Sequence, residues 1–436
     1  MASDVDNKLT KSYLLAEGDT MSDSSQRVAV VGGMRTPFVK AGAQFRNHDQ
    51  LDLSSHAVKG LVEKYISDPE KIDGLVWGRV LHDPRISNLA REVVFDVGLP
   101  KDIHALMVSN NCITSLHAMV DVADAIRAGR MSLGIAGGVE SMSTVPILFG
   151  REASAILMEA GMAKTLGDRF KAMSRLRFRH FKPKPLSFKE PSTGLTMGQH
   201  AELTVQQWGI GQDAQDRIAF NSHINAAAAT ADGRLKEEIS PLDGVDHDTI
   251  VRGDTTLEKL STLKSVFAPQ PAGTITAGNS SPLTDGAAAI LLASEEALLE
   301  NGLEAAAWIR DVEFAAIDPD EGLLMAPAIA VPRLLKRTGL SIDDIDIVEI
   351  HEAFGAQVVT NLAAWEQGWK EEPIGKIPME KINPLGSSIS VGHPFAATGA
   401  RIATTLANEM KRQDAKYGLI SVCAAGGMAC AMILER

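Results

Sequence analysis

The feature of this chain that most restricts its fold is an alternation of short apolar runs with alanine-rich segments. Runs rich in β-branched residues predict strands at 27–33, 73–81, 132–141, 345–354 and 418–427. Alanine-rich segments predict helices, among them 115–129 and 396–411. Continuous apolar runs are typical of strands that helices cover on both faces of a sheet. The sequence therefore predicts an α/β fold.

The order of these elements repeats along the chain. In the first half, a strand is followed by the turn-to-helix segment SNNCITSLHAMVDVADAIRAG and then by SLGIAGGVES. In the second half, IVEIHEAF is followed by SVGHPFAATGARIATTLANEM and then by GLISVCAAGG. Two βα halves of one topology are expected to pair into a pseudo-symmetric body with a crevice between them.

Two stretches lie outside this repeat. The first 26 residues have no apolar signal core, and they contain several acids but no arginine, unlike a mitochondrial transit peptide. We expect a disordered tail there, with Met21 as a candidate natural start. The stretch 143–283 is an insertion. Within it, 164–189 contains nine Lys or Arg, one acid and four interleaved Phe. Two interpretations of this run remain open. It forms either a solvated helix face or a binding surface for an anionic ligand, a lipid surface or an acidic partner.

Charge and cysteine content exclude several classes of protein. A net charge of −12 argues against a general nucleic-acid binder, because the chain has no overall basic field to hold phosphates. Three cysteines cannot build a disulfide framework, which favours a reducing compartment and predicts a cytoplasmic protein. No apolar run is long enough to span a membrane.

The stretch VSNNCITSLHA places Cys112 between a polar turn and the start of a predicted helix. Free N–H groups and the positive end of the helix dipole lower the pKa of a thiol there and favour the nucleophilic thiolate. A lone cysteine is more commonly a buried structural residue. The polar turn favours the nucleophile.

Three further segments carry reactive side chains. His393 lies on a glycine-flanked turn that opens a helix, where an imidazole can act as a base toward a thiol. His351 and Glu352 lie at the end of a predicted buried strand, and Cys423 precedes small residues whose N–H groups can approach a ligand. A core or capping histidine is the simpler alternative for His393. No C-x-x-C or H-x-x-x-H spacing supports a metal, so none is predicted.

Taken together, these segments make the chain resemble the thiolases, which cleave or form 3-ketoacyl-CoA thioesters. The resemblance extends from Arg27 to Arg436. Besides the Cys112 turn and HEAF, it includes RTPF (35–38), AGGVESMS (136–143), GLTMGQHAE (194–202), GIGQDAQDRIAFNSHINAAAA (209–229), GTITAGNSSPLTDGAAA (273–289), NPLGSSISVGHPFAATGAR (383–401) and the closing CAAGGMACAMILE.

The resemblance implies a role for each reactive residue. Cys112 corresponds to the nucleophile that takes the acyl group, and His393 to the histidine that activates it. Cys423 corresponds to the second cysteine, which acts as acid and base. His351 occupies a position that is Asn in many thiolases and helps to hold a water in the first oxyanion hole. The backbone N–H groups of Cys112 and Ala425 would form the second oxyanion hole.

Contacts to CoA are also implied, together with a fold. The positions that correspond to the pantetheine and nucleotide path are Arg252, Ala277, Ser281, Met197 and Phe354, of which several serve equally well as core or cap residues. The implied thiolase fold has two duplicated βαβαβαββ halves in a layered αβαβα arrangement with an inserted loop domain. The expected parts are a tail at 1–26, an N-terminal half at 27–142 plus 284–305, the loop domain at 143–283 and a C-terminal half at 306–436.

The chain departs from the common thiolase pattern at four places. HEAF has His351 in place of Asn, and this is similar to the β component of a trifunctional fatty-acid-degrading complex. Ala425 replaces a usual Gly, which would strain a turn that needs a positive φ. Pro282 stands where Gly is common. Asn110 and Asn111 replace Arg-Gln before the nucleophile, a change expected to affect the shape of the substrate tunnel.

These features favour cleavage of 3-ketoacyl-CoA by CoA in β-oxidation, with CoA as substrate and no other cofactor. The alternatives are a biosynthetic acetoacetyl-CoA thiolase, a ketoacyl-synthase-like condensing enzyme and a non-catalytic lipid-binding relative. Expected partners are CoA thioesters, further copies in a homodimer or tetramer, a hydratase/dehydrogenase α component, and a membrane met through the basic loop 164–189. No nucleic acid is expected.

Overall fold

The computed structural model describes residues 26–184, 187–269 and 272–436. The expected tail up to Ser25, with Met21, lies outside the described residues. The N-terminal half has the element order βαβαβαββ. Its elements are β1 (Val28–Arg35), α2 (Gln50–Tyr65), β3 (Gly74–Gly78), α3 (Leu89–Val97), β4 (His104–Val108), α4 (Thr114–Arg127), β5 (Leu133–Glu140) and, after the insertion, β6 (Thr284–Ser294). The short strand β2 (Val39–Lys40) pairs with β6, and α10 (Glu295–Asn301) leads to the second half.

The C-terminal half repeats this order with one strand fewer. Its elements are β7 (Ala307–Ala316), α11 (Pro327–Thr338), β8 (Ile347–Ile350), α12 (Gly355–Gln367), α13 (Ser388–Val391), α14 (Thr398–Gln413), β9 (Tyr417–Ala424) and β10 (Met428–Glu435). Where the first half has β4 beside β3, this half has only a parallel bridge between Val348 and Ile382. The duplication is therefore visible in the structure, but it is incomplete.

The two halves join into a single ten-stranded sheet of order β4-β3-β5-β6-β1-β7-β10-β9-β8, with β2 beside β6. The join between the halves is short, since β1 and β7 pair only at Ala29–Trp308 and Val30–Ala307. In each half the two innermost strand pairs are antiparallel and the outer pairs are parallel. This mixed sheet confirms the predicted α/β class.

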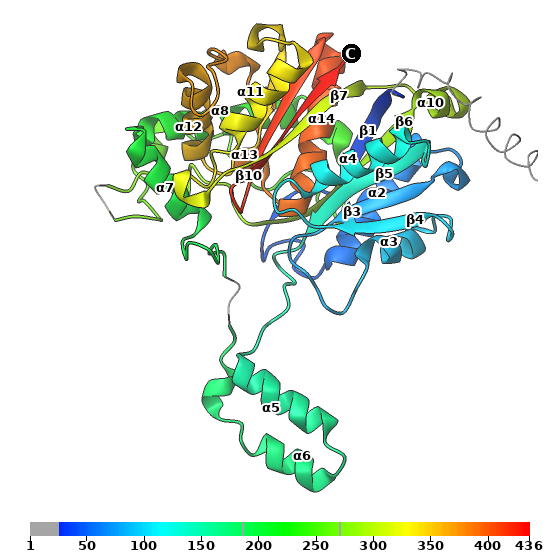
Figure 1. Ribbon diagram of the computed structural model, residues 1–436, viewed down its shortest axis with the longest axis vertical. Coiled ribbons are helices and arrows are strands. Elements are labelled where there is room, and N and C mark those ends of the chain that lie inside the picture. Colours follow the sequence, from blue (N-terminus) through cyan, green and yellow to red (C-terminus); the bar gives the residue numbers. More distant parts are fainter. Residues whose placement is uncertain (1–25, 185–186, 270–271) are drawn as a thin grey trace, which may run out of the picture.

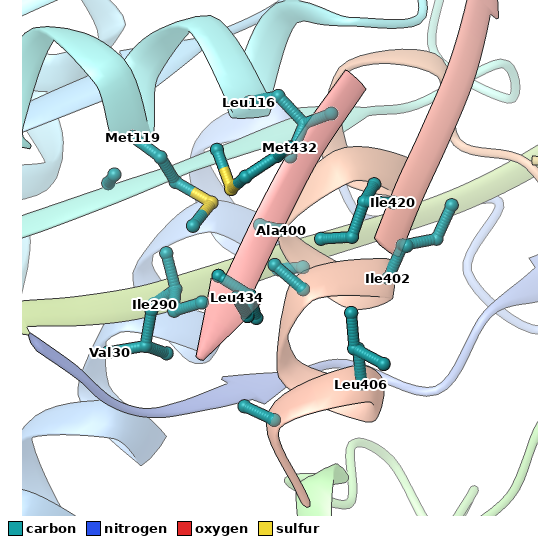
Figure 2. Packing of buried hydrophobic residues seen from close by; sticks show 14 of the residues in the cluster. Val30, Leu116, Met119, Ile290, Ala400, Ile402, Leu406, Ile420, Met432 and Leu434 are labelled. Atoms are coloured by element: carbon teal, nitrogen blue, oxygen red, sulfur yellow. The ribbon is translucent and has the colours of Figure 1, made fainter. Parts of the chain in front are cut away.

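The helices complete the layered arrangement that the resemblance implied (Figure 1). Helices α4 and α14 lie between the strands of the two halves, and their apolar faces form the central core with residues of β1, β6, β9 and β10. Figure 2 shows Leu116 and Met119 of α4 facing Met432 of β10, with Ile402 and Leu406 of α14 close by. Helices α2 and α3 cover the outer face of the first half, and α11 and α12 that of the second. The layers therefore follow in the order αβαβα, with α4 and α14 as the central helical layer.

The insertion contains two separate parts. A hairpin of α5 (Arg151–Met162) and α6 (Leu166–Met173), followed by a 3-10 turn at Phe178–Phe181, projects away from the body (Figure 1). Its base is closed by a bridge between Leu148 and Lys184. Helices α7 (Met197–Gln207), α8 (Gln212–Ala231) and α9 (Leu257–Ser261) instead pack on the C-terminal half. None of the described helices is long and apolar enough to cross a membrane.

Candidate active site

Cys112 lies in the turn between β4 and α4, two residues before the first residue of the helix. Asn111 adopts the left-handed conformation with φ 48°, which Asn tolerates better than most residues. Its side-chain amide donates to the carbonyl oxygen of Ala425 over 3.0 Å. The substitution of Asn111 for the common Gln therefore ties the Cys112 turn to the turn after β9, a role that the sequence did not predict.

His393 lies on the loop between α13 and α14, and three contacts fix it. Its backbone N–H donates to Thr284 Oγ1 over 2.6 Å. Its Nδ1 is 2.7 Å from Thr398 Oγ1, and its Nε2 is 3.2 Å from Cys112 Sγ. The Thr398 hydroxyl already donates to the Pro394 carbonyl, so it accepts from Nδ1–H. The Nε2 lone pair then faces the Cys112 thiol, as a general base requires.

Burial controls the protonation of this pair. Desolvation raises the pKa of Cys112 to about 12, although backbone N–H groups of Ala425 and of Cys112 itself lower it in part. Burial, with the nearby Arg401 charge, lowers the pKa of His393 to about 3. The sequence predicted a thiol activated by the helix terminus, and this prediction is wrong for the resting protein because desolvation outweighs the terminus. The resting pair is a neutral thiol beside a neutral imidazole.

His351 follows β8 and is fully buried beside His393, with the two ring centroids 4.1 Å apart. Its Nδ1 lies 2.7 Å from Ser388 Oγ, while its Nε2 has no hydrogen-bond partner among the described residues. The adjacent Glu352 accepts from Ser222 Oγ, Asn383 Nδ2 and the Ile389 N–H. Glu352 therefore fastens the HEAF turn to α8 and α13.

Cys423, near the end of β9, is 1% exposed, and burial together with the nearby Cys112 raises its pKa well above the ordinary value. The two sulfurs therefore lie close enough for their charges to interact, although they belong to different halves of the chain. Beyond the strand, Gly426 (φ 81°) and Gly427 (φ 73°) take the positive φ values of the turn, whereas Ala425 does not. The expected strain at Ala425 is absent, and its N–H points toward the Cys112 sulfur.

The same geometry brings together a set of metal-ligand types. Cys112, His351 and His393 each contribute one ligand atom, and these three atoms lie within 4.8 Å of one another. The sequence argued against a metal from the lack of short ligand spacings, and such spacings cannot reveal a cluster that three distant segments assemble. The 3.2 Å contact between Cys112 Sγ and His393 Nε2 is equally the contact of a nucleophile with its base.

The predicted CoA contacts fall into two groups. Arg252 and Ala277 line a cavity of about 190 Å³, together with His223, Lys259 and other residues, and Ser281 lies between the lining residues Ser280 and Pro282. Met197 and Phe354 do not line it. They pack in a buried cluster that includes Cys423, and Phe354 meets Phe267 edge-on at 5.7 Å. The structure therefore places Arg252 and Ala277 at a cavity, Ser281 next to its lining residues, and Met197 and Phe354 in a cluster with the second cysteine.

Several residues at the site were not predicted. Ser388 and Thr398 hold the two imidazoles, and hydroxyl residues near a reactive histidine are the only signal that the sequence offers for them. Phe188, from the end of the basic run, meets Phe395 at 6.4 Å between centroids, and Phe395 meets His393 at 5.0 Å. The insertion therefore reaches the site, which its composition does not reveal.

Comparisons with known proteins cover nearly the whole chain. The model of the thiolase N-terminal domain matches residues 28–296, and that of the thiolase C-terminal domain matches 303–436. A 3-ketoacyl-CoA thiolase of Pseudoalteromonas translucida is 40% identical over 94% of this chain and 97% of its own. One from Vibrio cholerae is 39% identical over 97% of this chain and 100% of its own.

Solved structures of two kinds resemble the fold. Human mitochondrial 3-ketoacyl-CoA thiolase in complex with CoA has a TM-score of 0.81 at 28% identity, covering 94% of this chain and 98% of that one. An acetyl-CoA acetyltransferase of Bacillus anthracis has a TM-score of 0.82 at 28% identity, covering 94% of this chain and 99% of that one.

Proposed function

This chain belongs to the thiolase family, and from that premise we propose that it is a 3-ketoacyl-CoA thiolase that uses Cys112 as its nucleophile. The observation that carries the proposal is the 3.2 Å contact between Cys112 Sγ and His393 Nε2, with Cys423 beside them. In the reaction a 3-ketoacyl-CoA and CoA give acetyl-CoA and an acyl-CoA shortened by two carbons. CoA enters as a substrate, and no other cofactor is proposed.

In the first half-reaction, His393 takes the Cys112 proton and the sulfur attacks the 3-keto carbon. The bond between carbons 2 and 3 breaks, and the electron pair leaves as the enolate of acetyl-CoA. The Cys423 thiol gives its proton to that carbanion, and the shortened acyl group remains on Cys112 as a thioester. The raised pKa of Cys423 favours this role, because the proton is present until a stronger base forms beside it.

Before the second half-reaction, the proton that His393 took from Cys112 passes to the Cys423 thiolate, so that both groups return to their starting states. The thiol of free CoA then enters and gives its proton to His393. Its sulfur attacks the thioester carbonyl, and Cys112 leaves as the thiolate and recovers its proton. Each addition places negative charge on an oxygen. The backbone N–H groups of Cys112 and Ala425 support one such oxyanion, and the ring nitrogens of His351 and His393 support the other. One such donor is typically worth about 100- to 1,000-fold in rate.

The degradative direction is supported more by sequence than by shape. Fold neighbours at nearly equal TM-scores include both a 3-ketoacyl-CoA thiolase and an acetyl-CoA acetyltransferase, so the fold does not separate the two activities. Relatives at 39–40% identity over nearly the full length carry the name 3-ketoacyl-CoA thiolase. The presence of Cys423 argues against a ketoacyl synthase, because that type of enzyme lacks the second cysteine. We propose that Arg252, Ala277 and Ser281 lie along the CoA path.

The test is a thiolysis assay across 3-ketoacyl-CoA substrates from short to long chains, run beside acetyl-CoA condensation. We expect thiolysis to be faster, and Cys112→Ala to abolish both turnover and the acyl-enzyme adduct seen by intact-protein mass spectrometry. Condensation of acetyl-CoA that outruns thiolysis with every chain length would instead favour the biosynthetic alternative. A normal rate in Cys112→Ala would refute the assignment of the nucleophile.

We further propose that the α5–α6 hairpin binds an anionic membrane surface. Its exposed apolar residues include Leu166 (82% exposed), Phe170 (77%) and Phe178 (97%), and the first two share one face of α6. The basic residues of the run flank these apolar residues in the sequence, in a chain whose net charge is −12. Exposed apolar residues ringed by cations are typical of helices that lie in a membrane interface. An acidic α component is the alternative occupant.

The structure allows a sharper test than neutralising the whole basic run. Because Arg175 pairs with Glu159 and Arg179 with Glu152, the charges of these two arginines are partly neutralised within the hairpin. The triple variant Lys171→Gln, Arg177→Gln, Lys182→Gln should lose co-sedimentation with phosphatidylglycerol vesicles but keep thiolysis of a short substrate. The matched control neutralises exposed lysines of the body, Lys59, Lys336 and Lys376. Equal loss in both triples would reject the hairpin as the docking surface.

The remaining parts of the proposal concern location and assembly. Three free cysteines and bacterial relatives support a cytoplasmic enzyme. We propose a homodimer or tetramer, and a hetero-complex with a hydratase/dehydrogenase α component. We also propose the division into an N-terminal half at 27–142 plus 284–305, a loop domain at 143–283 and a C-terminal half at 306–436.

A further inference from the structure

His351 has one ring nitrogen in use and one without a partner. Nδ1 lies 2.7 Å from Ser388 Oγ. Nε2 is buried and has no hydrogen-bond partner among the described residues. A buried polar atom of this kind usually forms a hydrogen bond with a ligand or a water molecule. A ring nitrogen of His351 lies within 4.8 Å of the Cys112 sulfur and of a ring nitrogen of His393. Whether Nε2 carries a proton decides what it can do there.

The surroundings of Ser388 determine that proton. Ser388 is fully buried, and Nη2 of Arg401 lies 3.3 Å from its oxygen. A guanidinium can only donate, so Ser388 accepts from Arg401. Among the described residues, the remaining partner of the Ser388 hydroxyl is His351 Nδ1. If Nδ1 carried the proton, the hydroxyl hydrogen would have no acceptor, at the cost of a buried unpaired donor.

We propose that Ser388, held by Arg401, is a positioning residue that donates to Nδ1 of His351 and so fixes the proton on Nε2. His351 then presents a ready N–H donor to an oxygen beside the His393 ring, the site of one proposed oxyanion. The two neighbouring imidazoles are held in opposite tautomers. Thr398 accepts from His393 and leaves Nε2 as a base, whereas Ser388 donates to His351 and makes Nε2 a donor.

The charges around His351 agree with a neutral ring. Burial, His393 and Arg401 all lower the pKa of His351 well below its ordinary value, so a second proton does not bind near neutral pH. Glu349 pairs with Arg401, with Nη1 and Oε2 3.8 Å apart, and makes no hydrogen bond to the ring. The tautomer is therefore set by hydrogen bonding and not by titration.

The chemical part of this inference rests on the proposed function, whereas the tautomer can be measured without it. Protein labelled with ¹⁵N in its histidine rings gives two-bond proton–nitrogen correlations that distinguish the tautomers, and the spectrum of His351→Asn assigns the signals. We expect Nε2–H and an accepting Nδ1 for His351, and the reverse for His393. A protonated Nδ1 in wild-type His351 would overturn the proposal.

Ser388→Ala should move the Nδ1 signal of His351 and lower kcat for thiolysis by about tenfold to a hundredfold, with KM little changed, because the donor acts on an oxyanion. Ser388→Thr restores a hydroxyl and should recover most of kcat. The control is Ser390→Ala in the same helix, which removes the 2.8 Å contact with Ser222 Oγ but none with His351.

The outcomes separate the two proposals. Wild-type protein that shows the expected tautomers but no thiolysis would reject the proposed function and leave the assignment of Ser388 intact. Equal losses of kcat in Ser388→Ala and Ser390→Ala, with unchanged His351 signals, would reject Ser388 as a positioning residue and leave the function intact.

Discussion

At the scale of single residues, the reactivity of Cys112 depends on one hydrogen-bonded neighbour more than on the helix that follows. The helix starts only at Thr114, and desolvation raises the thiol pKa to about 12. The thiolate therefore forms when His393 accepts the proton, 3.2 Å away, while backbone donors stabilise the sulfur. Such a site keeps its nucleophile protonated until substrate arrives.

Substitution of the buried second cysteine should separate acylation of Cys112 from cleavage of the carbon–carbon bond. Cys423→Ser should still form the acyl-enzyme on Cys112 from a plain acyl-CoA, because that step needs no proton at carbon 2. Cleavage of 3-ketoacyl-CoA should fall by about 100- to 10,000-fold, the range of a lost general acid or base. Mass spectrometry of the adduct and the thiolysis rate check the two halves separately. Unimpaired cleavage would exclude the acid/base role.

Burial of His393 also predicts how the fold responds to acid. In the folded protein the pKa of His393 is lowered from 6.5 to about 3. Between these pH values the imidazole is protonated in the unfolded chain but neutral in the folded protein. Stability contributed by this residue is present above pH 6.5 and is lost as the pH falls. From pH 7 to pH 5 the loss is about 2 kcal/mol. Urea unfolding of wild type and His393→Gln at both pH values should show this difference, and parallel losses would contradict it.

At the scale of elements, the sequence predicts where strands begin better than where they end. The run 345–354 was predicted as one strand, but β8 ends at Ile350. The HEAF residues that follow it are also buried, so the buried stretch continues past the end of the strand. The run 73–81 likewise ends as a strand at Gly78. The short strand β4 and the helix α5 were not predicted, and β4 is half-exposed, so it lacks the continuous apolar run of a buried strand. A helix in the basic run was one of the interpretations left open, and α6 occupies Leu166–Met173 of that run.

One glycine of β5 shows how an element positions the site. A Cβ on Gly138 would lie 2.4 Å from the carbonyl oxygen of Ala396, on the backbone that follows His393. Gly138→Ala should therefore cost about 1–3 kcal/mol, as overpacking does, and should lower kcat by shifting His393. The matched control is Gly161→Ala in α5, where a Cβ has open space and should stabilise the helix by about 0.5–1 kcal/mol. Thermal melts and thiolysis rates check both variants.

At the scale of the whole molecule, the site is assembled from segments hundreds of residues apart. The motifs predicted Cys112, His393, His351 and Cys423 as chemical groups, and the structure brings all four together. The hydrogen bonds that set proton positions could not be predicted, because they depend on which hydroxyl lies beside which ring nitrogen after folding. The same holds for Phe188, whose contact with Phe395 links the insertion to the site.

The projecting hairpin provides the last prediction. Leu148 and Lys184 are bridged, with the Lys184 N–H 2.8 Å from the Leu148 carbonyl oxygen, so a short Gly-Ser linker can replace 149–183 without stretching the chain. The deletion leaves Phe188 and the whole site in place. We therefore expect the shortened protein to fold, and to cleave a short-chain, water-soluble 3-ketoacyl-CoA within about threefold of wild type, less than 1 kcal/mol of barrier.

Binding to anionic vesicles should disappear in the same deletion, because the exposed apolar face and its cations are removed together. Circular dichroism and the melting temperature establish that the body is intact before either comparison is made. A folded deletion protein that has lost short-chain thiolysis would place the hairpin within the catalytic machinery. Retained vesicle binding would move the docking surface to the body, which carries the net negative charge of the chain and is the less suitable face for an anionic membrane.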